Sequence, residues 1–127
     1  MADIEGSQNL AQAFAKQYYN TFDTNRAGLG SLFVDVSILT FEGAALMGKD
    51  TIMAKLQGLP FQTVQHVITT VDGQPTVDGG VIIHVLGQLK TDNDPPHSYS
   101  ETFHLKKGPG DNYVILNQVF RLGVHHG

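Results

Sequence analysis

The segment from Val81 to Pro96 limits the fold of this chain more than any other. Its first eleven residues, VIIHVLGQLKT, alternate as in a β-strand, with Val81 and Ile83 on one face and Ile82 and Leu86 on the other. Both faces are largely apolar, whereas a strand with one wet face carries polar residues at every second position. We therefore expect the strand to be covered twice, by its own core and by something else, for which a second copy of the chain is a candidate.

The strand ends in an acidic turn with the sequence DNDPP. Pro95 and Pro96 restrict the backbone here, so Asp92 and Asp94 are held at the strand end with little freedom. We interpret a hydrophobic cavity with these two carboxylates on its rim as the working site of the protein.

Helical patterns come first in the chain and strand patterns follow. Leu10, Phe14, Tyr18 and Phe22 recur at every fourth position, which is typical of an amphipathic helix. We predict helices over residues 8–22, 26–32 and 49–56, and strands over residues 33–41, 61–71, 81–91, 97–106 and 113–122, with a short strand around Val77. This order predicts a single α+β domain, residues 1–127, whose helices pack on one face of a curved antiparallel sheet.

The other face of the predicted sheet mixes apolar side chains with hydroxyls and is too apolar to be left in water. It would carry Ile82, His84, Leu86, Ser98, Ser100, Thr102, Ile115, Asn117 and Val119. We predict that a symmetric homodimer buries this face. The predicted interface includes Ile82, His84, Leu86, Thr102 and Val119.

Composition excludes several classes of function. The net charge of -4 and pI near 5.8 argue against a nucleic-acid partner or an anionic membrane, which need a basic surface. The absence of cysteine excludes disulfides and thiol catalysis. No apolar run approaches the ~20 residues that span a bilayer, and the acidic start MADIEGSQ does not match a signal peptide. We expect a cytosolic or nucleocytoplasmic protein.

Two stretches approach known binding motifs without completing them. Residues 43–50, GAALMGKD, resemble a phosphate-binding loop, but Asp50 stands where a hydroxyl should bind magnesium. We interpret this stretch as a turn that leads into a helix. The acidic turn resembles a calcium loop, but His97 and Phe103 replace its glycine and glutamate. Only His125 and His126 are close together among the six histidines, so we predict no metal site and no cofactor.

One pair of polar residues offers an alternative, enzymatic interpretation. His66 shares a strand face with Val64, and Glu101 shares one with Phe103, so both polar side chains would point into the same cavity. There they could act as a general base and its orienting partner. A hydrogen-bonded polar pair inside the core is the more ordinary explanation.

Five segments together resemble the nuclear transport factor 2 family, in one register over nearly the whole chain. They are FAKQYYNTFDTNR at 14–26, LTFEG at 39–43, LPFQTVQH at 59–66, GQLKTDNDP at 87–95 and NQVFRL at 117–122. The resemblance implies a cone-shaped α+β fold, a homodimer through the sheet and no catalytic activity. It also implies import of the GDP-bound GTPase Ran into the nucleus, binding of phenylalanine-glycine repeats of nucleoporins, and a location in cytoplasm, nucleus and nuclear pore.

The resemblance also assigns residues. Ran would insert a phenylalanine into the cone, and its basic residues would pair with the acidic rim, Glu42, Asp92 and Asp94. The cavity wall would be Phe41, Leu59, Phe61, Val64, Leu89, Thr91 and Phe120, with His97 at the mouth in place of a methionine. Ser7 stands where family members have an aromatic that helps to grip nucleoporins, so we expect either weaker repeat binding or another residue that supplies the ring. The same cone fold also hosts isomerases and dehydratases, for which His66 and Glu101 would be the candidate catalytic residues.

Overall fold

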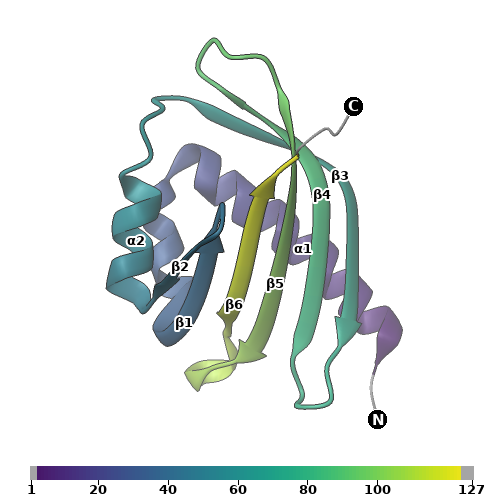
Figure 1. Ribbon diagram of the computed structural model, residues 1–127. Coiled ribbons are helices and arrows are strands. Elements are labelled where there is room, and N and C mark those ends of the chain that lie inside the picture. The colour runs from purple at the N-terminus through teal and green to yellow at the C-terminus, as the bar shows by residue number, and fades with distance from the viewer. Residues whose placement is uncertain (1–2, 124–127) are drawn as a thin grey trace.

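The computed structural model describes residues 3–123, which form helices packed against one curled sheet (Figure 1). Helix α1, Ile4–Thr24, starts four residues before the predicted residue 8. The side chain of Asp3 explains this early start, because it accepts a hydrogen bond of 2.8 Å from the backbone N–H of Gly6 and so caps the helix. The buried face of α1 carries Ala11, Ala15, Tyr18, Tyr19 and Phe22.

The next elements are the 3-10 helix η1, Arg26–Leu32, the strands β1, Phe33–Phe41, and β2, Ala44–Met47, and helix α2, Lys49–Gln57. Strand β2 corrects the expectation of a plain turn before α2. Glu42 and Gly43 both have positive φ, 52° and 88°, which reverses the chain tightly enough for β2 to pair with β1 as a hairpin.

Four long strands make up the second half of the chain. They are β3, Val64–Pro75, β4, Val81–Thr91, β5, His97–Lys107, and β6, Tyr113–Leu122, with the short helix η2, Pro109–Asp111, before β6. The predicted strand around Val77 is wrong. Strand β3 stays paired with β4 as far as Pro75, so residues 76–80 form the hairpin turn and Val77 is fully exposed at its tip.

The six strands form a mixed sheet in the order β2-β1-β6-β5-β4-β3. All neighbours are antiparallel except β1 and β6, which are parallel. The sheet curls without closing, and α1, η1 and α2 lie on its inner side, which gives an α+β cone (Figure 1). The core lies between the helices and this inner face, where Ile83, Val85, Phe103 and Leu105 are fully buried.

A bulge in β6 changes the predicted outer face of the sheet. Leu105 pairs with Ile115, but His104 pairs with Asn117, which leaves Leu116 as an extra residue. Ile115 is therefore fully buried in the core, and its assignment to the outer face is wrong. Beyond the bulge, the alternation places Val119 outside.

The outer face carries exposed apolar side chains at its centre. Ile82 is 42% exposed, Leu86 41% and Val119 45%, and the polar residues His84 and Thr102 lie between them in the β4–β5 register. Strand β4, which suggested two apolar faces, thus has one face in the core and one that nothing within residues 3–123 covers. None of the helices within residues 3–123 is both long and apolar enough to cross a bilayer.

Candidate functional site

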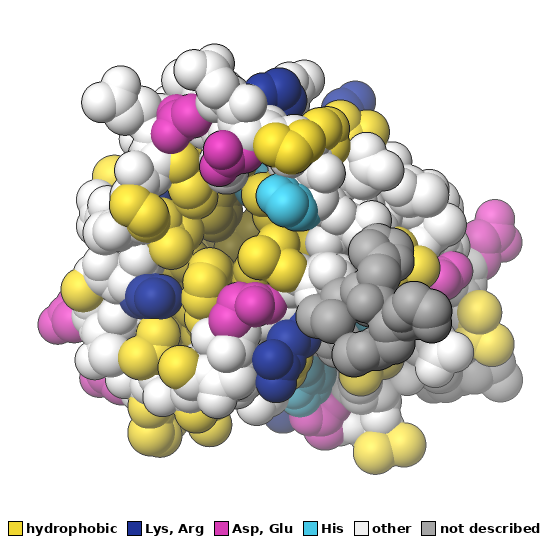
Figure 2. All heavy atoms as spheres, turned by 45° about the horizontal axis from the view of Figure 1, so that its top comes forward, with side chains coloured by type: hydrophobic (Ala, Val, Ile, Leu, Met, Phe, Trp, Pro, Cys, Tyr) yellow, Lys and Arg dark blue, Asp and Glu magenta, His cyan; other side chains and the backbone are white. Residues whose placement is uncertain are grey.

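A cavity of about 270 Å³ opens at one end of the sheet. Figure 2 shows it as a hollow with hydrophobic side chains inside and charged side chains around it. Its wall comes from α1, β1, α2, β3, β4, β5, β6 and the loops after α2 and β4. The lining residues are Tyr18, Phe22, Leu39, Phe41, Leu56, Leu59, Phe61, Val64, His66, Leu89, Thr91, Asp94, His97, Glu101, Gln118, Phe120 and Leu122.

All eight residues expected in the cavity, from Phe41 to Phe120, line it, and so do His66, Glu101 and Asp94. Their part in binding a partner stays a prediction. Six further lining residues were not predicted, namely Tyr18, Phe22, Leu39, Leu56, Gln118 and Leu122. The alternation of β-strands could have found three of these, because Leu39 shares a face with Phe41, and Gln118 and Leu122 share one with Phe120.

Stacked aromatic rings make up much of the wall. The rings of Phe41 and Phe120 stack with centroids 4.8 Å apart, and Tyr99 stacks on Phe120 at 5.9 Å. The guanidinium of Arg26 lies 4.5 Å from the centroid of the Phe61 ring, and its Nη1 donates a 3.0 Å hydrogen bond to the carbonyl of Leu56. These contacts hold the apolar wall in place, so the hollow is preformed.

The three predicted rim acids differ in their surroundings, and only Asp94 among them lines the cavity. The Asp92 carboxylate accepts from the backbone N–H groups of Thr63, at 2.9 Å, and Gln62, at 3.1 Å. The hydrogen bond from Thr63 is the main reason why the pKa of Asp92 lies below its usual value. The Glu42 carboxylate accepts from the N–H of Leu122. Within residues 3–123, the Asp94 carboxylate has no hydrogen bond and lines the cavity.

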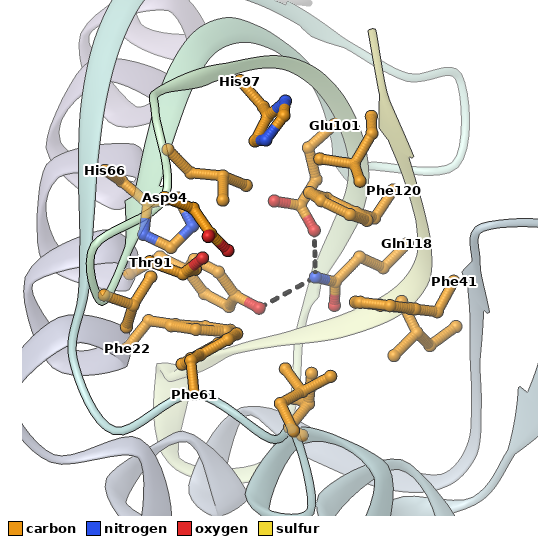
Figure 3. Close-up of a pocket in the computed structure, with 17 residues that line it drawn as sticks. Phe22, Phe41, Phe61, His66, Thr91, Asp94, His97, Glu101, Gln118 and Phe120 are labelled. Carbon is orange, nitrogen blue, oxygen red and sulfur yellow. Dashed lines mark hydrogen bonds between the residues drawn. The ribbon is translucent and has the colours of Figure 1, made fainter. Parts of the chain in front are cut away.

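A cluster of polar side chains lies at the inner end of the cavity. The Tyr19 hydroxyl donates to Oε1 of Glu101 at 2.8 Å. Nε2 of Gln118 donates to Oε2 of Glu101 at 2.6 Å and to the Tyr18 hydroxyl at 2.8 Å (Figure 3). Burial raises the pKa of Glu101 to about 7. Burial, and then the charge of Glu101, hold the pKa values of Tyr18 and Tyr19 well above the ordinary value.

The predicted pairing of His66 with Glu101 is wrong. Nδ1 of His66 lies 2.6 Å from Oδ1 of Asp23, and its backbone N–H donates to Oδ2 of the same carboxylate at 2.8 Å. Asp23 is close because the last turn of α1 packs beside the start of β3. The ring of Tyr19 stacks on the His66 ring at 4.6 Å. Each member of the predicted pair is thus held by other residues, although both line the cavity.

Ser7, the position expected to affect nucleoporin binding, is buried between α1 and β3. Ser7 is only 8% exposed on the side of α1 that faces β3, where a Cβ at Gly73 would lie 2.9 Å from its carbonyl oxygen. The side chain at position 7 is therefore not exposed for a partner to contact.

The histidines form no metal site in the part of the chain that the structure describes. No group of three His, Cys, Asp or Glu residues there could hold a metal ion, and His125 and His126 lie outside the described residues.

The raised pKa of Glu101 predicts how stability depends on pH. Its folded-state pKa of about 7 lies above the ordinary 4.5, so the folded protein binds the proton more tightly. This contribution is complete below pH 4.5 and is lost as pH rises through 7, for a total of about 3 kcal/mol. The amide in Glu101→Gln cannot ionise, so this variant should not lose that stability. As pH rises from 4.5 to 8, its free energy of unfolding minus that of the wild type should increase by about 3 kcal/mol.

Urea denaturation of both proteins between pH 4.5 and 8 measures this difference, in which the other titrating groups cancel. Glu5→Gln, which alters an exposed glutamate in the first turn of α1, is the matched control and should follow the wild type. Parallel stability curves for Glu101→Gln and the wild type would show that Glu101 does not titrate in this way.

Comparison with known proteins gives consistent matches over the whole described fold. The family model described as "Nuclear transport factor 2 (NTF2) domain" matches residues 10–122. The protein named Nuclear transport factor 2 from Emericella nidulans is 47% identical over 124 residues, 96% of this chain and 97% of that protein. Nuclear transport factor 2B of Arabidopsis thaliana is 42% identical over 115 residues, 89% and 91% of the two chains. The solved structure of nuclear transport factor 2 from Cryptosporidium parvum superimposes with a TM-score of 0.87 at 36% identity and 94% coverage of both chains.

Proposed function

The chain belongs to the nuclear transport factor 2 family, and from this premise we propose that it carries the GDP-bound form of Ran into the nucleus. Its role as a nuclear transport factor follows from relatives that bear this name over nearly their full length. These relatives are transport factors, and the protein is not an enzyme. The cargo, the nucleoporin repeats and the location in cytoplasm, nucleus and nuclear pore belong to the proposal.

The apolar cavity with acids on its rim is the observation that carries the proposal. Acidic side chains lie on two sides of the hollow (Figure 2). A phenylalanine ring inserted between Phe41, Phe61 and Phe120 would gain about 1.5 to 3 kcal/mol from burial of its apolar surface. Carboxylates around the opening would orient a partner with basic residues beside that ring and would raise its association rate.

The rim residues are expected to contribute unequally. Asp94 faces the cavity without a hydrogen bond in residues 3–123, so its charge is free to meet a cation. Asp92 already binds the backbone before β3, so it serves both to shape the mouth and to supply charge. His97 lies at the opening next to these acids, where a protonated ring would weaken their field.

The outer face of the sheet supports a homodimer within this proposal. Ile82, Leu86 and Val119 are exposed there, with His84 and Thr102 between them. A two-fold axis through this face would bury the same patch on both subunits. Phenylalanine-glycine repeats would then bind weakly near α1, because Ser7 is small and buried.

Calorimetric titration with Ran tests the proposed cargo. The protein should bind Ran loaded with GDP and should give no heat with Ran loaded with a non-hydrolysable GTP analogue, because the segment that inserts its ring changes conformation with the nucleotide. Equal binding of both forms would contradict selective carriage of Ran-GDP. Binding of neither form would reject Ran as the cargo.

A further inference from the structure

The amide oxygen of Gln118 is a buried acceptor without a partner. Gln118 lines the cavity and is only 2% exposed, and its Oε1 has no hydrogen bond in the described part of the chain. Buried polar atoms are nearly always paired, because an unpaired one loses its hydration without compensation. An acceptor left open at a cavity wall therefore suits a ligand that brings a donor.

The neighbours of Gln118 fix the orientation of its amide. Nε2 lies 2.6 Å from Oε2 of Glu101 and 2.8 Å from the Tyr18 hydroxyl (Figure 3). Above pH 7 the Glu101 carboxylate is ionised and can only accept hydrogen bonds, so the amide nitrogen must face it. Rotating the amide by half a turn would place two acceptors against each other. The oxygen is therefore held away from Glu101, on the side of Phe41 in Figure 3.

The size and lining of the cavity define the rest of the ligand. Apart from the polar cluster, the inner wall is aromatic and aliphatic, with the stacked rings of Phe41 and Phe120 beside Gln118. A dry cavity of ~150 Å³ binds benzene, so about 270 Å³ leaves room for more than a single phenyl ring. A ring inserted by phenylalanine would bring no donor to the open acceptor.

We propose that this cavity also binds a small neutral aromatic molecule with one N–H or O–H donor, which bonds to Oε1 of Gln118. The flat apolar part of such a molecule would lie against the aromatic wall, and its donor would complete the polar cluster. This inference goes beyond the carriage of a protein and does not depend on it. A bound molecule would compete with any partner that inserts a ring into the same space.

Indole and indene form the matched probe pair. Both are bicyclic and nearly equal in shape, but only indole has an N–H donor. Titration of the protein alone at pH 8, followed by amide chemical shifts in NMR, should give an affinity for indole about tenfold higher than for indene. The largest shifts should lie at cavity residues. Equal affinities for the two probes, or no shifts with millimolar indole, would overturn the proposal.

Two variants locate the hydrogen bond. Gln118→Leu removes the acceptor and keeps a side chain of similar volume. The variant should therefore bind indole and indene with about equal affinity, whatever that affinity is. Gln88→Leu makes the same change on the exposed outer side of β4 and should keep the wild-type preference. A preference that survives in folded Gln118→Leu would reject Gln118 as the acceptor. The wild-type comparison decides the proposal if that variant does not fold, and neither experiment involves Ran.

Discussion

Glu42→Lys should weaken binding of Ran-GDP at least about a hundredfold, as measured by calorimetry at moderate salt. Glu42 lies in the turn between β1 and β2, beside the lining residues Phe41 and Leu122, where we propose that basic residues of Ran arrive. The substitution removes an attractive charge and places a cation against them. Such like-charge contacts cost several kcal/mol at an interface.

Two further variants separate charge from structure in this prediction. Asp111→Lys makes the same reversal at a position with similar backbone, φ 63° against 52° for Glu42, but lies in the turn at the other end of the sheet (Figure 1). It should bind Ran-GDP like the wild type. Glu42→Gln keeps an acceptor for the N–H of Leu122 and removes only the charge, so its affinity should lie between those of the wild type and Glu42→Lys. Unchanged affinity in folded Glu42→Lys would refute the rim assignment.

Leu86→Glu should convert the proposed homodimer into a monomer. Leu86 is 41% exposed near the centre of the outer face of β4, and a two-fold interface would bury two copies of it. Each copy of the variant would bring an unpaired carboxylate into that interface, which costs several kcal/mol. The dimer dissociation constant should therefore rise at least about a thousandfold.

Gel filtration with light scattering at micromolar concentration measures this change in mass. The wild type should give about twice the chain mass of 13.8 kDa, and Leu86→Glu should give the chain mass. Met47→Glu is the matched control, because Met47 is 59% exposed on the edge strand β2, away from the predicted patch, and should remain dimeric. A monomeric wild type would remove the interface altogether.

The sequence predicted most of the secondary structure because it follows local periodicity, and the same alternation placed His66 and Glu101 in the cavity. The alternation over residues 81–91 correctly separated Ile83 and Val85, now in the core, from Ile82 and Leu86, now outside. The other predicted wall residues, from Phe41 to Phe120, came from the resemblance to a family. The periodicity of the sequence alone could not predict that the loop after α2 lies beside the end of β4.

The features that were missed depend on contacts between distant segments or on single backbone angles. The extra residue Leu116 in β6 moves Ile115 into the core, and nothing in the local sequence marks that bulge. Strand β2 depends on the positive φ of Glu42, an unusual conformation for a non-glycine residue. His66 binds Asp23 across 43 positions of sequence, so alternation on its own strand could place the ring but not identify its partner.

The preformed hollow also affects how long a molecule of this protein survives. Side chains around an unfilled apolar space lack contacts that a guest would supply, so the occupied form resists unfolding more than the empty one. A guest present at a hundred times its dissociation constant adds about 2.7 kcal/mol of stability. Proteases that cleave transiently unfolded chains would therefore remove empty molecules first. Abundance of the protein would then follow the supply of whatever fills the cone.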